Sequence, residues 1–183
     1  MRIISGIYRG RQFKAKAPKG VRPTADAVRE SIFNVLNNIV DINDARVCDI
    51  CAGTGALGIE ALSRGAAFCN FIEKSPGTAR YIKNVLAEFR AQNSNYKITV
   101  LDAVKALKTD DSSYDIIFFD PPYFENLYDN VLNLIAENNI LAENGVAVVE
   151  HDEKSELQFH EKFEILNQKK SGSTIVTYLE LKH

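Results

Sequence analysis

The residues best suited to chemistry are Asp120-Pro121-Pro122-Tyr123, which follow the apolar run Ile116–Phe119. The Asp120 carboxylate and the Pro121 carbonyl can accept both hydrogens of an exocyclic amine on a nucleic-acid base. Such hydrogen bonds favour a pyramidal nitrogen, whose lone pair is then free to attack an electrophile. The prolines fix the backbone in advance, and the Tyr123 ring offers a stacking face for the base. The less specific alternative is a rigid proline turn capped by an acid.

A second segment, around Gly53, Gly55 and Gly58, has the spacing Gly-x-Gly-x-x-Gly between an expected strand and an expected helix. Glycines at a helix N-terminus let the backbone approach a ligand closely. Glu73 follows Gly53 by 20 residues at the end of the next strand, where an acid can accept hydrogen bonds from both ribose hydroxyls of a nucleoside. The alternative for Glu73 is a surface carboxylate.

This pattern also fits a nicotinamide-dependent oxidoreductase, but Asp49 at the strand end would repel a pyrophosphate. S-adenosylmethionine has no phosphate and carries an ammonium and a sulfonium, which an acid suits. Asp102 ends the third strand and can accept from the adenine amine, or can instead cap a helix. We therefore expect cofactor contacts from the residues around these strand ends, namely Asp49, Ala52, Gly53, Gly55, Ala56, Leu57, Glu73, Lys74, Asp102 and Ala103.

The elements that position these residues alternate between strand and helix, which predicts a mostly parallel sheet with helices on both faces. A helix after Thr24, with Thr24 as its cap, comes first, and Ser75-Pro76 begins another. Strands are expected at 46–50, 68–73, 97–101, 114–120 and 145–150, helices at 56–64 and around 128–135, and a C-terminal antiparallel hairpin at 163–169 and 174–181. The fold class predicted is thus α/β, the class I (Rossmann-like) methyltransferase arrangement.

Charge is distributed unevenly along the chain. Residues 1–22 hold seven of the 22 basic residues and no acid, which leaves 15 basic against 24 acidic residues in the remainder. Segregated charge of this kind favours a polyanionic partner for the first segment, although a solvated edge is equally consistent with it. We expect residues 1–24 to form a basic N-terminal arm with a small β-hairpin, and residues 25–183 to form the S-adenosylmethionine-binding domain.

Other sequence features narrow the class of protein. No apolar run is long enough to span a bilayer and the start lacks a secretory signal, so we expect a cytoplasmic protein with no membrane partner. The three cysteines fit a reducing compartment. Cys48 and Cys51 form a Cys-x-x-Cys, but further zinc ligands are scattered, so we expect no metal and interpret Cys48 as a small buried strand residue. Nothing demands a dimer, and a monomer is expected.

Together these motifs resemble a known family, the bacterial methyltransferases of guanine N2 in 16S ribosomal RNA. The resemblance covers nearly the whole chain. It includes Arg9-Gly10-Arg11, Arg22-Pro23-Thr24, Val28-Arg29-Glu30, the segment 52–58, Asp120-Pro121-Pro122-Tyr123 and Val149-Glu150. The catalytic tetrapeptide is shared with adenine-N6 DNA methyltransferases, whereas the arm is more specific to the ribosomal RNA family.

The resemblance implies methyl transfer from S-adenosylmethionine to one guanine of 16S rRNA in the assembling or assembled 30S subunit. It also implies that the arm contacts RNA phosphates, through Arg2, Arg9, Arg11, Arg22 and Arg29. Arg29 can alternatively pair with an acid and hold the arm to the body. Adenine-N6 methylation of DNA, a nicotinamide-dependent oxidoreductase and a catalytically silent RNA-binding module remain the alternatives.

Overall fold

The computed structural model describes residues 2–13, 25–121, 125–155 and 157–182, and within them strands and helices alternate as the sequence predicts. The helices are α1 (Asp26–Leu36), α2 (Ala56–Ser63), α3 (Pro76–Glu88), the 3-10 turn η1 (Asn93–Asn95), α4 (Ala103–Lys108) and α5 (Glu125–Glu137). The strands are β1 (Arg46–Ile50), β2 (Phe68–Ile72), β3 (Tyr96–Thr99), β4 (Tyr114–Phe119), β5 (Leu141–Asp152), β6 (Phe163–Ser171) and β7 (Thr174–Leu181).

The strands form one seven-stranded sheet in the order β3-β2-β1-β4-β5-β7-β6. The first five are parallel to one another, and β7 joins β5 antiparallel, with β6 as the antiparallel edge. This confirms the predicted α/β fold with its C-terminal hairpin. From β1 to β3 the strands are added towards one side of the sheet, and from β4 onward towards the other. Open α/β sheets bind ligands at this switch point, beyond the carboxyl ends of the strands.

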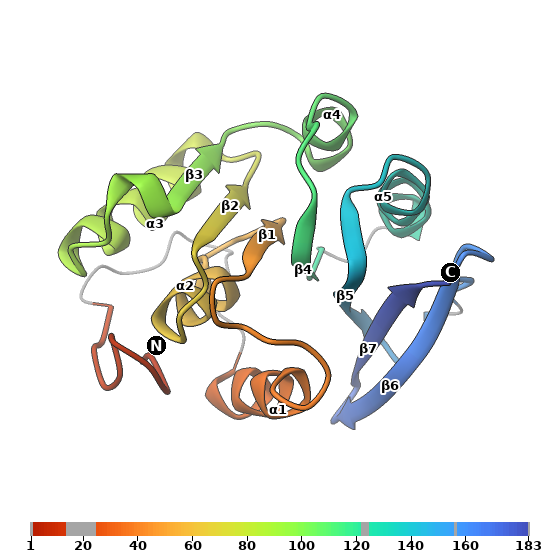
Figure 1. The fold of residues 1–183 in the computed structure, drawn as a ribbon, viewed down its shortest axis with the longest axis horizontal. Coiled ribbons are helices and arrows are strands. Elements are labelled where there is room, and N and C mark those ends of the chain that lie inside the picture. Colours follow the sequence, from red (N-terminus) through yellow and green to blue (C-terminus); the bar gives the residue numbers. More distant parts are fainter. Residues whose placement is uncertain (1, 14–24, 122–124, 156, 183) are drawn as a thin grey trace.

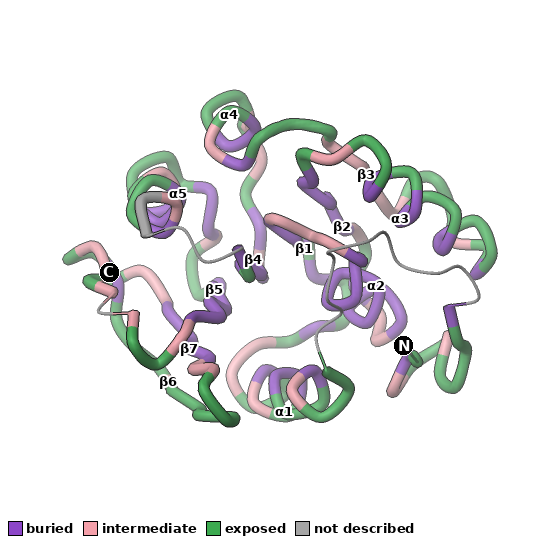
Figure 2. The backbone as a smooth tube through the Cα atoms, turned by 180° about the vertical axis from the view of Figure 1, so that it is seen from behind, coloured by how far each residue is buried: buried purple, intermediate pink, exposed green. Residues whose placement is uncertain are grey.

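Helices cover both faces of the sheet (Figure 1). One face packs against α1, α2, α3 and the N-terminal segment, and the other packs against α4 and α5. Successive strand residues alternate between these two layers, since Val47 belongs to the first core and Cys48 to the second. Figure 2 shows the resulting pattern, with buried backbone along the central strands and exposed backbone on the outer helical turns.

Several local signals in the sequence act as predicted. The Ser75 hydroxyl accepts the Thr78 N–H at 3.3 Å, and Pro76 begins α3. Cys48 is fully buried on β1, as expected for a small apolar residue. The predicted cap Thr24 lies outside the described residues, and α1 begins at Asp26.

Some elements differ from the prediction: η1 was not predicted, and β3 ends at Thr99 where the prediction extended to residue 101. Helix α4 is absent from the predicted elements because its six residues are too few to show a helical repeat. Strand β5 begins at Leu141, before the predicted residue 145, because Tyr114 pairs with Leu141 ahead of a register shift that precedes Ile116. In the described part of the chain, no helix has the length and apolarity that crossing a membrane would need.

Residues 2–13 lie against the body of the protein. Arg2 and Gln12 form an antiparallel bridge, so the segment folds back on itself as a small hairpin. Ile3 is 1% exposed and joins the core on the α1–α2–α3 face, together with Phe13. The first segment of the chain is therefore part of the packed structure.

Candidate active site

The loop between β1 and α2 carries the glycines, and its backbone requires them. Gly55, the N-cap of α2, has a φ of 72°, a left-handed conformation that L side chains rarely adopt. At Gly58 a Cβ would lie 2.4 Å from a ring carbon of Phe71 and 2.6 Å from the Cys69 sulfur. Gly55 therefore serves the turn, and Gly58 lets α2 pack closely on β2.

Asp49 stands on β1 directly beneath this loop. Its side chain is buried, and one carboxyl oxygen accepts the Gly58 N–H at 2.9 Å. Burial raises the pKa of this carboxyl to about 8, against the lowering effect of the Gly58 hydrogen bond, and the Asp120 and Glu73 carboxylates raise it further. A positive charge placed nearby would favour the ionised form of Asp49.

Glu73 ties the glycine loop to the end of β2. Its two carboxyl oxygens accept the N–H groups of Gly53 at 3.0 Å and of Ser75 at 2.8 Å. The residue is 9% exposed, so it is not the surface carboxylate that the sequence left as an alternative. Each oxygen can accept a second hydrogen bond, and the ribose contact of Glu73 stays a prediction. Lys74 beside it is exposed.

Asp102 lies three residues after the end of β3 and caps α4. One of its carboxyl oxygens accepts the N–H groups of Val104 at 3.1 Å and of Lys105 at 3.3 Å. This confirms the helix-capping alternative for Asp102. The second carboxyl oxygen is not used by the cap, and its contact to an adenine amine remains a prediction. Ala103 is buried under the first turn of α4.

Asp120 and Pro121 follow β4 at the same edge of the sheet as the glycine loop and Glu73. Asp120 is exposed, yet its surroundings are dense enough that burial raises the pKa of its carboxyl to about 6. Pro121 is buried. Pro122 and Tyr123 lie outside the described residues. The edge thus brings together Asp49, Glu73 and Asp120, whose mutual repulsion contributes to the raised pKa of Asp49.

Glu150 is a further acid at this edge, and the sequence prediction did not assign it a role. In the parallel pairing of β4 with β5, Phe119 is the partner of Val149. Asp120, the residue after β4, and Glu150 of β5 are the next pair in this register and therefore neighbours. Burial, then Asp120 and then Asp49, raises the pKa of Glu150 to about 8. The rule that placed Asp120 after a buried strand would have found Glu150 as well.

Two polar atoms near this position are buried without a hydrogen-bond partner among the described residues. They are Oε1 of Glu150, a residue 7% exposed, and the hydroxyl of Tyr178, a residue with no exposed surface. Tyr178 pairs with Val148 across β5 and β7, two residues before Glu150 and on the same face. A buried polar group without a hydrogen bond costs on the order of 1–3 kcal/mol of folding free energy. A ligand that bonds to either of these two atoms would therefore recover part of that cost.

The basic N-terminal segment presents three of its predicted RNA-binding residues to solvent, namely Arg2, Arg9 and Arg11. The Arg11 guanidinium donates to the Phe89 carbonyl at 3.0 Å and lies 5.4 Å from the centre of the Tyr8 ring. It is therefore held in place with part of its surface outward. Arg22 lies outside the described residues.

Arg29 does not take the predicted role of an RNA-binding residue. Its side chain is fully buried, where no phosphate can reach it. Its guanidinium donates to Asp26 at 3.0 Å and to the Arg2 carbonyl, and lies 3.5 Å from a carboxyl oxygen of Glu60. Arg29 instead connects the arm to α1 and α2, which was the alternative interpretation of this residue.

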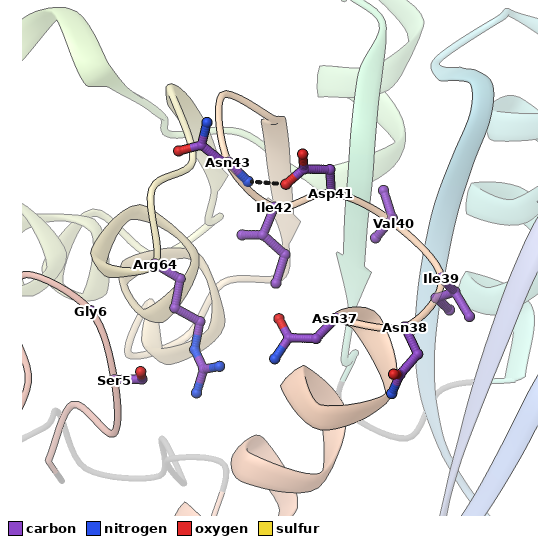
Figure 3. Close-up of a pocket in the computed structure, with 10 residues that line it drawn as sticks. All are labelled: Ser5, Gly6, Asn37, Asn38, Ile39, Val40, Asp41, Ile42, Asn43 and Arg64. Atoms are coloured by element: carbon purple, nitrogen blue, oxygen red, sulfur yellow. Dashed lines mark hydrogen bonds between the residues drawn. The ribbon is translucent and has the colours of Figure 1, made fainter.

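A polar hollow lies at the opposite edge of the sheet, near the start of β1 (Figure 3). It is lined by Ser5 and Gly6 of the arm, by residues 37–43 and by Arg64 at the end of α2. Asp41 accepts the Asn43 N–H at 2.9 Å, and the Arg64 guanidinium lies 4.5 Å from the centre of the Phe33 ring. None of the predicted catalytic or cofactor-binding residues in the described part of the chain contributes to this hollow.

Known proteins resemble this chain in both sequence and fold. The Haemophilus influenzae protein named ribosomal RNA small subunit methyltransferase D is 33% identical over 180 residues, covering 97% of this chain and 91% of the relative. The solved structure of yhhF from Escherichia coli superposes with a TM-score of 0.88 at 32% identity, covering 100% of this chain and 98% of that one. The fold also matches SMU.776, solved in complex with SAH, with a TM-score of 0.61 at 17% identity, covering 84% of this chain and 48% of that one.

The strand order and the helices on both faces define a class I, Rossmann-like methyltransferase fold, as does the likeness to the Escherichia coli structure. Within that class, the family model described as conserved hypothetical protein 95 matches residues 1–180. The chain belongs to this family.

Proposed function

We propose that this protein transfers the methyl group of S-adenosylmethionine to the exocyclic N2 amine of a guanine in small-subunit ribosomal RNA. The observation that carries the proposal is the position of Asp120 and Pro121, which follow β4 at the edge that also holds the glycine loop, Asp49 and Glu73. The name of the Haemophilus influenzae relative supports ribosomal RNA as the substrate class.

The acids at this edge fit a positively charged cofactor. Burial and mutual repulsion raise the pKa values of Asp49 and Glu150 to about 8, so a cation brought among them relieves an unfavourable arrangement. Such a site disfavours the pyrophosphate of a dinucleotide. SAH in the related fold of SMU.776 supports the same cofactor class.

Residues of the glycine loop, with Glu73, Lys74, Asp102 and Ala103, would hold the cofactor. When bound, S-adenosylmethionine supplies an electrophilic methyl group. Glu73 would accept from the ribose hydroxyls, and the second carboxyl oxygen of Asp102 would accept from the adenine amine.

Asp120 and Pro121 prepare the nucleophile. The Asp120 carboxylate and the Pro121 carbonyl each accept one hydrogen of the target amine, which draws the nitrogen lone pair out of conjugation with the ring. Their positions are fixed before the base arrives, so little reorganisation is needed. Asp120 is then able to take the proton that the amine releases, since the pKa of its carboxyl is raised to about 6 by burial.

The exposed arginines of the arm would supply phosphate contacts. Arg2, Arg9 and Arg11 project from one packed hairpin, so RNA bound there has a fixed position relative to α2 and the glycine loop. The target base must leave its stack, or already lie in a loop, to reach Asp120. We infer that Arg22, outside the described residues, belongs to the same contact surface.

Unmethylated 30S subunits and labelled S-adenosylmethionine provide the test. We expect label on one guanine, identified as N2-methylguanosine after nuclease digestion. Label found on adenine alone would reject the proposed substrate. Calorimetry with S-adenosylmethionine and with NAD tests the cofactor separately, because tight binding of NAD with no binding of S-adenosylmethionine would overturn the proposed methyltransferase activity.

A further inference from the structure

Strands β4 and β5 lie side by side in the sheet (Figure 1). Asp120 follows β4 directly, and by the register of the two strands its neighbour is Glu150 of β5. Phe118 and Val148 are partners in the register and both lie in the core on the α1–α2–α3 face. Because side chains alternate along a strand, Asp120 and Glu150, two residues further, point to that same face. Neighbouring strands lie roughly 4.8 Å apart, so the two carboxyl groups are close enough to converge on one edge of a single base.

Glu150 has so far been counted only among the acids that fit a cationic cofactor, and no contact to the target base has been assigned to it. It is 7% exposed, and its Oε1 has no hydrogen-bond partner among the described residues. The Tyr178 hydroxyl on the next strand is also buried without a partner in that part of the chain. A ligand with a second N–H next to its amine would donate to this buried acceptor and so satisfy it.

The Watson–Crick edge of guanine has this additional donor. Its N2 amine is adjacent to the ring N1–H, so two donor groups lie side by side. We propose that Glu150 accepts the N1–H of the target guanine while Asp120 accepts from the N2 amine. This inference rests on the proposed function and names the residue that selects the base.

The same pair of acceptors rejects adenine. Next to the N6 amine, adenine presents the lone pair of N1, which Glu150 would repel once the cationic cofactor has favoured the ionised form of its carboxyl. A site built to accept a substrate N–H discriminates strongly against an analogue that lacks it, because its buried acceptor is then left unpaired. Glu150 is therefore a specificity-determining residue, and Asp120 alone would not choose between the two purines.

The analogue 2-aminopurine keeps the 2-amine of guanine but has a lone pair at N1 in place of N1–H. It also lacks the O6 carbonyl, so the contact is isolated by comparing the preference of wild type with that of the variant. The substrates are 16S rRNAs with guanine or 2-aminopurine at the methylated nucleotide, assembled into 30S subunits. For wild type and Glu150→Gln, kcat/KM is measured on both. The amide introduced by Glu150→Gln can donate to the N1 lone pair, so we expect the preference of this variant for guanine over 2-aminopurine to shrink by about tenfold or more.

Controls separate the possible outcomes. Glu164→Gln changes an exposed glutamate on the edge strand β6 and should keep the wild-type preference. Glu150→Asp withdraws the carboxylate by one methylene and should lower kcat/KM on guanine while changing that on 2-aminopurine little. Calorimetric binding of S-adenosylhomocysteine verifies that each variant is folded.

An unchanged guanine preference in Glu150→Gln and Glu150→Asp would overturn the role of Glu150. In that event wild-type methylation of guanine N2 would still support the proposed function. If wild type methylates no guanine in these particles, it is the proposed function that fails, together with the inference that depends on it.

Discussion

Arg29 of α1 and Glu60 of α2 lie 3.5 Å apart, and neither side chain has any exposed surface. The oxygens of Glu60 also accept the backbone N–H groups of Ile4 at 2.9 Å and of Ser5 at 3.0 Å, and one of them lies 2.9 Å from Nε of Arg64. One buried carboxylate therefore joins the arm, α1 and α2.

Replacing Glu60 by Gln should destabilise the protein substantially. The change removes the buried charge partner of the Arg29 guanidinium, and breaking a buried ion pair in this way typically costs about 3–5 kcal/mol. We expect a loss of about 3 kcal/mol in the free energy of unfolding, measured by urea denaturation. Glu164→Gln on the surface of β6 should change it by less than about 0.5 kcal/mol. Equal stabilities of the two variants would contradict the role of Glu60.

Asp120→Ala should retain S-adenosylhomocysteine binding but lose at least about a hundredfold in turnover, as when a preorganised polar contact is removed. Asp120→Asn, which keeps one acceptor oxygen, should lose less. Single-turnover rates on 30S subunits with saturating cofactor measure the effect. Turnover equal to that of wild type would exclude Asp120 from the reaction.

The stability of the cofactor-free protein should fall as the pH rises. Burial first, and repulsion between carboxylates second, raises the pKa values of Asp49 and Glu150 to about 8 in the folded state, above the value of about 4 in an unfolded chain. A carboxyl with a raised pKa favours folding while it is protonated, so its contribution is complete below pH 4 and is lost as the pH passes through 8.

Glu150→Gln removes one of these carboxyls. At pH 9 the variant should be more stable than wild type by at least about 1 kcal/mol, and the two should converge towards pH 4. Thermal or urea unfolding across this pH range provides the measurement. A constant difference at every pH would mean that Glu150 has an ordinary pKa in the folded protein.

Arg9→Ala combined with Arg11→Ala should weaken RNA binding and flatten its salt dependence. Each lost phosphate contact lowers the slope of log K against log salt by about 0.7–0.9. Arg11 also contacts Phe89 and Tyr8, so the single variant Arg9→Ala is the cleaner measurement. It should lower the slope by the amount that corresponds to one phosphate contact. A slope identical to that of wild type would remove these residues from the interface.

Much of the fold could be predicted because its signals are local. The strand Arg46–Ile50 has the predicted bounds, and Ser75 with Pro76 starts α3 as expected. The glycine loop, Glu73 and Asp120 share one edge because the ends of parallel strands meet there, which topology alone dictates. The finer roles of these residues stay predictions.

The parts that could not be predicted depend on contacts between distant segments. Arg29 looked like one more basic residue near the arm, and only the packing of α1 on α2 places it against Glu60. Asp102 could be a ligand contact or a cap until the short helix α4 was seen to begin after it. The proposed role of Glu150 rests on the register of β4 with β5 and on its buried Oε1, which lacks a hydrogen-bond partner among the described residues. Neither feature can be read from a sequence.

The arm precedes its hydrogen-bond partners by more than fifty residues in the chain. Ile4 bonds to Glu60 across 56 positions, and Tyr8 bonds to Ser63 across 55. As the nascent chain emerges, these first residues therefore remain unattached until α2 has been synthesised and has packed against β1 and β2. A basic hairpin cut from the rest would lack the surface that covers Ile3, so this segment cannot be transplanted as an independent module.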